Sequence, residues 1–73
     1  MTSNSEHIRA TIGTNIKRIR ENKNLTQDEV AKSAKISTNY YAKIERGEVS
    51  TSPEKLHRIM KALKVDASAI FPS

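Results

Sequence analysis

The 73-residue sequence contains no cysteine. Disulfide bonds and thiolate metal sites are therefore excluded, together with the class of small secreted domains that disulfides hold together. The sequence also lacks an apolar run long enough for a membrane span, which needs about 20 residues, or for the core of a signal peptide. We therefore expect a cytoplasmic domain that has no membrane partner.

Groups that could carry out catalysis are scarce as well. The two histidines, His7 and His57, lie far apart in the sequence, and neither is part of a pattern with a nucleophile, a carboxylate pair or a metal ligand. We expect both on the surface, and we expect Met60 in the core rather than at a cofactor. The sequence thus predicts no enzyme activity, no metal and no cofactor.

Positive charge is in excess. Thirteen Lys and Arg residues against eight Asp and Glu give a net charge of +5, which favours a polyanionic partner, although a solvated basic surface would have the same composition. The length corresponds to one small domain whose single core is only marginally sufficient, so that dimerisation would add useful buried surface.

The most informative segment is residues 25–47, LTQDEVAKSAKISTNYYAKIERG. Thr26 followed three residues later by Glu29 is a capping box, which predicts a helix start. Ser37 is an N-cap residue type before a second amphipathic segment. Only residues 35–37 separate the two predicted helices. A connection of this length is typical of a helix-turn-helix, whose second helix lies in a DNA major groove.

A longer helix is predicted upstream of this segment. Residues 1–4 are expected to be disordered, and Ser5 is expected to be the N-cap. A stripe of isoleucines spaced by four, four and three residues indicates the buried side of the helix: Ile8, Ile12, Ile16 and Ile19. Gly13 within this stripe costs about 1 kcal/mol relative to alanine, which suggests that another helix approaches closely there.

Two further helices are predicted downstream. Gly47 is expected as a left-handed C-cap, and Ser52 followed by Pro53 as the next N-cap and first helical residue. Asp66 is expected to cap one last short helix that ends at Ile70 and Phe71. No segment alternates with a period of two, as a strand would. The sequence predicts an all-α fold of five helices in a single domain over residues 5–73.

Segments LTQDEVAKSAKIS and YYAKIERG, with IGTNIKRIRENKNLT before them and SPEKLHRIMKALKVDASAIF after them, resemble the lambda-repressor-like, Cro-type helix-turn-helix family, also called the XRE family. The resemblance covers most of the chain and implies a compact five-helix DNA-binding domain, similar to a stand-alone repressor or a restriction-modification controller protein. One departure is Lys35, at a turn position where glycine is common. A left-handed backbone there would cost lysine about 1 kcal/mol.

The resemblance also implies which residues contact DNA. Thr38, Asn39 and Lys43 match the base-contacting positions, and their side chains suit the edges of bases in the major groove. A second set matches positions that contact phosphates: Gln27, Tyr40, Arg46, Ser50 and Thr51. For Tyr40 two readings remain open, a phosphate contact through its hydroxyl group or packing of its ring on the surface.

Two structural roles complete the expectations. By resemblance, Arg20 pairs with Glu45 and ties the first helix to the recognition helix; the alternative is a solvated arginine. A homodimer interface is expected in the C-terminal segment of the sequence. Its predicted residues are Leu63, Val65, Ile70 and Phe71. The alternative for Phe71 is that it folds back over its own core.

The sequence therefore predicts a sequence-specific transcriptional regulator that binds a pseudo-palindromic operator as a homodimer. Its expected partners are double-stranded DNA, a second copy of the chain and RNA polymerase, which a promoter-bound regulator can contact. The competing hypothesis is an antitoxin-like module that uses the same fold to bind proteins. The polar character of Thr38, Asn39 and Lys43 favours DNA, because a protein-binding face would be more apolar.

Overall fold

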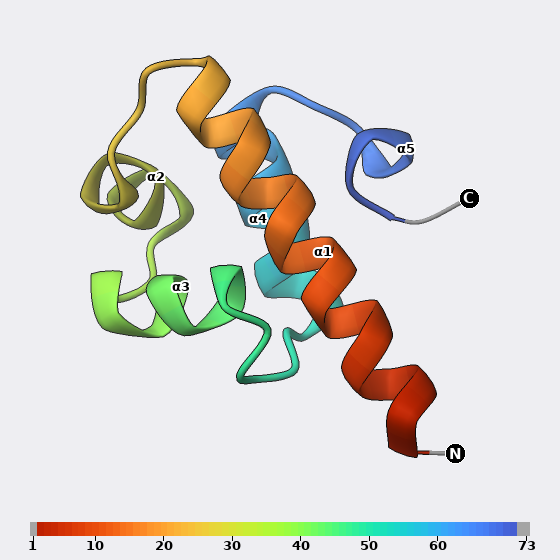
Figure 1. Ribbon diagram of the computed structural model, residues 1–73. Coiled ribbons are helices and arrows are strands. Elements are labelled where there is room, and N and C mark those ends of the chain that lie inside the picture. Colours follow the sequence, from red (N-terminus) through yellow and green to blue (C-terminus); the bar gives the residue numbers. More distant parts are fainter. Residues whose placement is uncertain (1, 72–73) are drawn as a thin grey trace.

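Five helices form the fold, and no strand occurs among residues 2–71, the part of the chain that this computed structural model describes. They are α1 (Thr2–Asn22), α2 (Gln27–Ala34), α3 (Thr38–Glu45), α4 (Pro53–Leu63) and α5 (Ala67–Ile70). Helix α2 packs against α3 and α4, while the long α1 contacts α3 and α5 (Figure 1). The Cα radius of gyration, 11.2 Å, matches the value of about 11 Å expected for a compact domain of this length. The predicted all-α fold is confirmed.

Four of the predicted helix starts are confirmed by their N-caps. The side chains of Thr26, Ser37, Ser52 and Asp66 each accept a hydrogen bond from an amide in the following first turn. At Thr26 the capping box is complete, because the Glu29 amide donates to Thr26 Oγ1 at 3.0 Å and the Thr26 amide donates to the Glu29 carboxylate at 2.8 Å. The N-cap at Ser37 begins α3 so soon after α2 that only residues 35–37 connect the two helices.

The predicted start of the first helix was wrong. Helix α1 begins at Thr2 rather than after Ser5, so residues 2–4 form its first turn; Met1 lies outside the described residues. No proline or glycine separates these residues from the rest of the helix, so nothing in the sequence stops its hydrogen bonding from extending. Ile8, predicted to be buried, is 44% exposed, because the N-terminal part of α1 projects beyond the other helices (Figure 1).

The core corrects part of the predicted dimer interface. Leu63 and Ile70 have no exposed area, so neither is available to a second copy. Helix α5 turns back onto α1, where Asn15 Nδ2 donates to the Ile70 carbonyl at 2.7 Å, and Ile70 fills the space between them. Val65 is half-buried against the core, whereas Phe71 is 41% exposed. None of the helices among the described residues is both long and apolar enough to cross a bilayer.

Two left-handed residues end the helices of the helix-turn-helix. Lys35, the C-cap of α2, has φ of 62°, and Gly47, which directly follows the C-cap Arg46 of α3, has φ of 73°. The left-handed conformation predicted for Gly47 is confirmed, one residue after the cap. At Lys35 the same conformation costs about 1 kcal/mol that glycine would not lose. It is retained because the following amide, that of Ile36, can then donate to the Ala31 carbonyl at 3.0 Å and close the end of α2.

Gly13 allows the C-terminal end of α3 to lie directly against α1. A Cβ atom at this position would be 2.5 Å from the carbonyl oxygens of both Ile44 and Glu45. These are backbone atoms, which cannot move aside as a flexible side chain could. The predicted reason for a glycine within this helix is therefore confirmed: the last turn of α3 occupies the space of the missing side chain.

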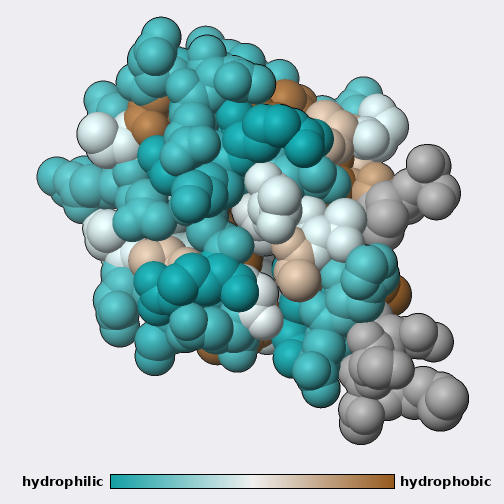
Figure 2. All heavy atoms as spheres, in the orientation of Figure 1, coloured by the Kyte–Doolittle hydropathy of each residue, from teal (hydrophilic) through white to brown (hydrophobic). Residues whose placement is uncertain are grey.

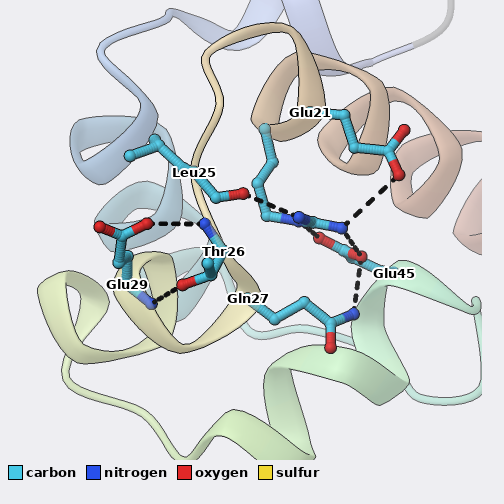
Figure 3. Close-up of polar contacts among 7 residues, drawn as sticks. Glu21, Leu25, Thr26, Gln27, Glu29 and Glu45 are labelled. Carbon is cyan, nitrogen blue, oxygen red and sulfur yellow. Dashed lines mark hydrogen bonds and ion pairs between the residues drawn. The ribbon is translucent and has the colours of Figure 1, made fainter.

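The predicted ion pair between Arg20 and Glu45 is present and joins the same two helices. Arg20 Nε donates to Glu45 Oε2 at 2.6 Å and Nη2 donates to Oε1 at 3.2 Å, a bidentate arrangement. The exposed fractions of the two side chains are only 11% and 2%. Arg20 also donates from Nη1 to the Leu25 carbonyl at 2.8 Å, and Gln27 Nε2 donates to Glu45 Oε1 at 2.9 Å (Figure 3). Helices α1, α2 and α3 thus converge on one carboxylate.

This network determines the charge of Glu45. Burial would raise the pKa of its carboxyl group, but the hydrogen bonds from Arg20 and Gln27 and the charge of Arg20 outweigh burial and lower that pKa. In turn, the hydrogen bond to Glu45 raises the pKa of Arg20. Both groups are therefore charged at neutral pH, and neither can lose its partner without leaving a buried charge.

We expect strong coupling between Arg20 and Glu45. Each single alanine variant leaves the other charge buried and unpaired, which should lower the free energy of unfolding by about 3 kcal/mol. The double variant removes both charges and should lose clearly less than the sum, with a coupling of about 1 to 3 kcal/mol. Urea denaturation of the four proteins measures the cycle, and additive losses would contradict a role as a clamp.

The pair should also make stability depend on pH. Because the folded-state pKa of Glu45 is lower than that of an unfolded glutamate, its contribution is fully present above the unfolded pKa and is lost as the pH falls through the folded pKa. Between about pH 7 and pH 3, the wild-type protein should therefore lose more stability than Glu45→Gln, a variant that has no carboxylate to protonate. Parallel losses in the two proteins would be the contrary result.

Candidate nucleic-acid interface

Helix α3 has a buried side and an accessible side. Tyr41, Ile44 and Glu45 are buried, and the apolar pair fills the core while Glu45 joins the ion pair. Of the three residues predicted to contact bases, Asn39 is exposed and Thr38 and Lys43 are half-buried. Asn39 and Lys43 are four residues apart and therefore lie on the same side of the helix. The structure thus leaves all three predicted base-reading side chains at least partly accessible.

Thr38 is engaged with a residue of α2 that the sequence analysis did not select. Its hydroxyl group donates to Asp28 Oδ1 at 2.7 Å, and the other carboxylate oxygen of Asp28 lies 3.3 Å from Lys32 Nζ. The hydrogen bond from Thr38, followed by the hydrogen bond and charge of Lys32, lowers the pKa of Asp28. An ionised carboxylate only accepts hydrogen bonds, so the direction of this bond is fixed.

Gln27, predicted to contact a phosphate, is held by the buried carboxylate of Glu45. It lies at the first position of α2, is half-buried, and donates one amide hydrogen to Glu45 Oε1. A primary amide has two donor hydrogens. One hydrogen therefore remains for another acceptor while the first anchors the side chain.

Tyr40 packs beneath the loop that follows α3. Its hydroxyl group donates to the Ser50 carbonyl at 3.2 Å, and Lys55 Nζ lies 4.9 Å from the centre of its ring, a distance typical of a cation–π contact. Phosphate oxygens only accept hydrogen bonds, so Tyr40 could donate to one only after leaving Ser50. Of the two alternatives for Tyr40, these contacts with Ser50 and Lys55 favour packing of the ring.

Arg46 and the loop after α3 form the remaining predicted phosphate-contacting group. Arg46 Nε donates to Glu48 Oε2 at 2.6 Å and Nη2 donates to Oε1 at 3.3 Å, with both side chains about half exposed. The hydrogen bond between them raises the pKa of Arg46 and lowers that of Glu48. Ser50 is exposed and Thr51 is half-buried. Because the ion pair is open to water, Arg46 can exchange Glu48 for another anion at little cost.

Two contacts that support this surface were missed by the sequence analysis. Arg58 Nε donates to the Ala34 carbonyl at 2.8 Å and so ties α4 to the end of α2. Asp28 holds Thr38 across the turn, as described above. The pairs within helices, Glu54 with Arg58 and Asp28 with Lys32, are spaced by four residues and could have been read from the sequence. The contacts between helices have no such signal.

The rest of the surface is mostly hydrophilic in the view of Figure 2. A groove between α1, the loop after α3 and the start of α4 has a largely apolar lining, and we call it the α1–α4 groove. Its apolar lining consists of Ile8, Ile12, Val49, Pro53, Leu56 and Phe71. Within the described residues, no group of His, Asp and Glu is arranged to hold a metal ion.

Solved structures of regulators have the same fold. The restriction-modification controller protein C.AhdI from Aeromonas hydrophila superposes with a TM-score of 0.83 at 22% identity, over 86% of this chain and 96% of that one. The controller protein C.Esp1396I, solved as a tetramer in complex with its natural 35 base-pair operator, superposes with a TM-score of 0.78 at 29% identity, over 85% and 82% of the two chains.

Sequence comparison gives the same result. The immunity repressor protein of Bacillus phage phi105 is 40% identical over 60 residues, which are 82% of this chain and 42% of the repressor; the chain thus spans less than half the length of that relative. The family model HTH_3, described as helix-turn-helix, matches residues 16–70, from the middle of α1 to the end of α5. These comparisons confirm the resemblance read from the sequence: the chain belongs to the helix-turn-helix family.

Proposed function

We propose that this chain is a sequence-specific DNA-binding transcriptional regulator that binds a pseudo-palindromic operator as a homodimer. The observation that supports this best is the construction of α3. Its buried side is fixed by Tyr41, Ile44 and the Arg20–Glu45 pair, while its other side presents polar side chains. A rigidly held helix with an accessible polar face is what reading a major groove requires.

The bases are read by Thr38, Asn39 and Lys43. Asparagine can bond adenine through two hydrogen bonds, and lysine can donate to both acceptors of guanine. These residues lie in the first two turns of α3, the part of a recognition helix that reaches the base edges. A protein-binding module, such as an antitoxin, is less well supported, because these positions are polar.

Phosphates are held at both ends of the helix-turn-helix. At one end Gln27 has one amide hydrogen left after its bond to Glu45. At the other end Arg46 can exchange Glu48 for a phosphate, and Ser50 and Thr51 supply hydroxyl groups from the adjoining loop. Tyr40 would join them only after leaving Ser50. These contacts position the domain without reading the sequence.

A second copy of the chain covers the α1–α4 groove. The groove contains both large apolar side chains that are strongly exposed among the described residues, Ile8 at 44% and Phe71 at 41%. Exposed apolar clusters of this kind mark interaction surfaces. Ser50 and Thr51 lie at the edge of this groove, so an isologous contact here lies beside the proposed phosphate-binding loop. Reading two half-sites one helical turn apart requires the two copies of α3 to be about 34 Å apart.

Removing the Lys43 side chain should weaken recognition of one base in the DNA site. Lys43→Ala should lower affinity by about 1 to 3 kcal/mol for duplexes with the preferred base at one position and relax the preference there. Lys23→Ala, which removes the same charge from the exposed turn directly after α1, is the control and should leave base preferences unchanged. Selection from random duplexes measures both. Equal losses for Lys43→Ala on selected and scrambled DNA would remove Lys43 from the readout.

Most of the affinity should be electrostatic. With about six to ten phosphate contacts per dimer, binding of the wild-type protein should weaken by roughly 10³ to 10⁵ between about 50 and 200 mM salt. Titrations at several salt concentrations give the slope, and binding that hardly changes with salt would contradict the proposed phosphate contacts.

Dimerisation should depend on Phe71. Each protomer loses about 1.5 kcal/mol of apolar burial in Phe71→Ala, so the association constant of the symmetric dimer should fall about a hundredfold. The control is His57→Ala, which changes an exposed residue of α4 outside the α1–α4 groove. Sedimentation equilibrium measures association, and circular dichroism checks the helices. Equal association of Phe71→Ala and the wild-type protein would rule out this interface.

A further inference from the structure

Asp28 stands beside the proposed base-reading surface without a role in the function proposed above. It is the second residue of α2, and it accepts the hydroxyl hydrogen of Thr38, the first residue of α3, at 2.7 Å. Its side chain is 56% exposed, so burial does not account for the contact. A carboxylate close to the bound polyanion costs electrostatic energy, and Lys32 at 3.3 Å offsets only part of its charge.

The contact restricts what Thr38 can offer to a base. A threonine hydroxyl group has one donor hydrogen and two acceptor lone pairs. The hydrogen is directed to Asp28, in a charge-assisted bond that is stronger than one between neutral groups. Only the lone pairs of the Thr38 oxygen remain for a base edge, so Thr38 can accept a hydrogen bond there but cannot donate one.

The base edges of the major groove differ in this respect. Adenine and cytosine each present an amino group that donates, whereas guanine and thymine present only acceptors at the corresponding place. Two acceptors that face each other cannot form a hydrogen bond. The carbonyl oxygen of guanine or thymine would therefore lose its hydrogen bond to water on binding and gain none from Thr38. Thr38 in the state described here therefore distinguishes amino bases from carbonyl bases.

We propose that Asp28 is a specificity-determining positioning residue: by holding the hydroxyl hydrogen of Thr38, it makes Thr38 an acceptor that selects adenine or cytosine at the base it meets. This inference rests on the proposed DNA binding through α3. It assigns to Asp28 a role without any direct contact to DNA, which separates it from Lys43 and Asn39.

The test compares sites selected from random duplex DNA by the wild-type protein and four variants. The wild-type protein should prefer adenine or cytosine over guanine or thymine at one position, by about fivefold for one hydrogen bond. Asp28→Ala frees the hydroxyl group to donate as well as accept, so guanine and thymine should become acceptable there. Thr38→Val keeps the shape without the hydroxyl group and should lose the same preference.

The third variant controls for charge. Glu48→Ala removes a negative charge from the same surface, but from a residue bound to Arg46 rather than to Thr38. Asp28→Ala and Glu48→Ala should both bind all duplexes more tightly through electrostatics, yet only Asp28→Ala should change the base preference. Combining Asp28→Ala with Thr38→Val should produce no change in preference beyond that of Thr38→Val alone. Thermal denaturation of each variant checks that the fold is intact.

The contrary outcomes are distinct. If the wild-type protein selects a site and Asp28→Ala keeps its preference at every position, the role of Asp28 is overturned while the proposed function stands. If Asp28→Ala loses the preference but Thr38→Val retains it, Asp28 reads the base directly and the inference is again wrong. If the wild-type protein selects no sequence at all, the proposed function and this inference both fall.

Discussion

The position of α3, and with it the side chains on its accessible side, depends on neutralising one buried carboxylate. Glu45 is at the end of α3, with only 2% of its side chain exposed. A charge removed from water to this degree is tolerated only with a close partner and with its lone pairs occupied. Arg20 from α1 and Gln27 from α2 meet both conditions. The requirement of a single group therefore joins the three helices, and Gly13 permits the approach that brings Arg20 within reach.

Arg20 is better suited to this position than lysine would be. Its guanidinium group donates twice to Glu45 and once to the Leu25 carbonyl, which requires several donors in a fixed plane. The third of these bonds fixes the loop between α1 and α2 just before the capping box at Thr26. The same residue thus positions both the start of α2 and the end of α3. The turn at residues 35–37 joins the other two ends of these helices, so their relative orientation is constrained at both ends.

Features with a local cause could be predicted from the sequence. The capping box at Thr26, the N-caps at Ser37 and Ser52, and the spacing of the core residues each depend on neighbours within a few positions. The Arg20–Glu45 pair spans 25 residues and came from family resemblance, since no local pattern indicates it. The start of α1 was misjudged because several cap residue types follow one another there.

The mistakes about burial have a different cause. Ile8 was expected in a buried stripe and Ile70 at a dimer interface, yet Ile8 is 44% exposed and Ile70 has no exposed area. Which of them is buried depends on where α1 extends beyond the other helices and on where α5 turns back. Neither feature is encoded within a few residues, so both required the complete fold. The contact of Thr38 with Asp28 was missed for the same reason, because it crosses from one helix to the next.

Several donors of the candidate interface are engaged by carboxylates of the same chain. Gln27 donates to Glu45, Thr38 to Asp28, and Arg46 to Glu48. The buried bond to Glu45 is the one that α3 cannot lose, because breaking it weakens the support of a buried charge. The exposed pair of Arg46 and Glu48 contributes little to stability and is the easiest to exchange. The carboxylates thus differ in how firmly they hold their donors. Glu45 fixes the position of the Gln27 side chain, whereas Glu48 pairs with Arg46 in an exposed contact that a phosphate could replace.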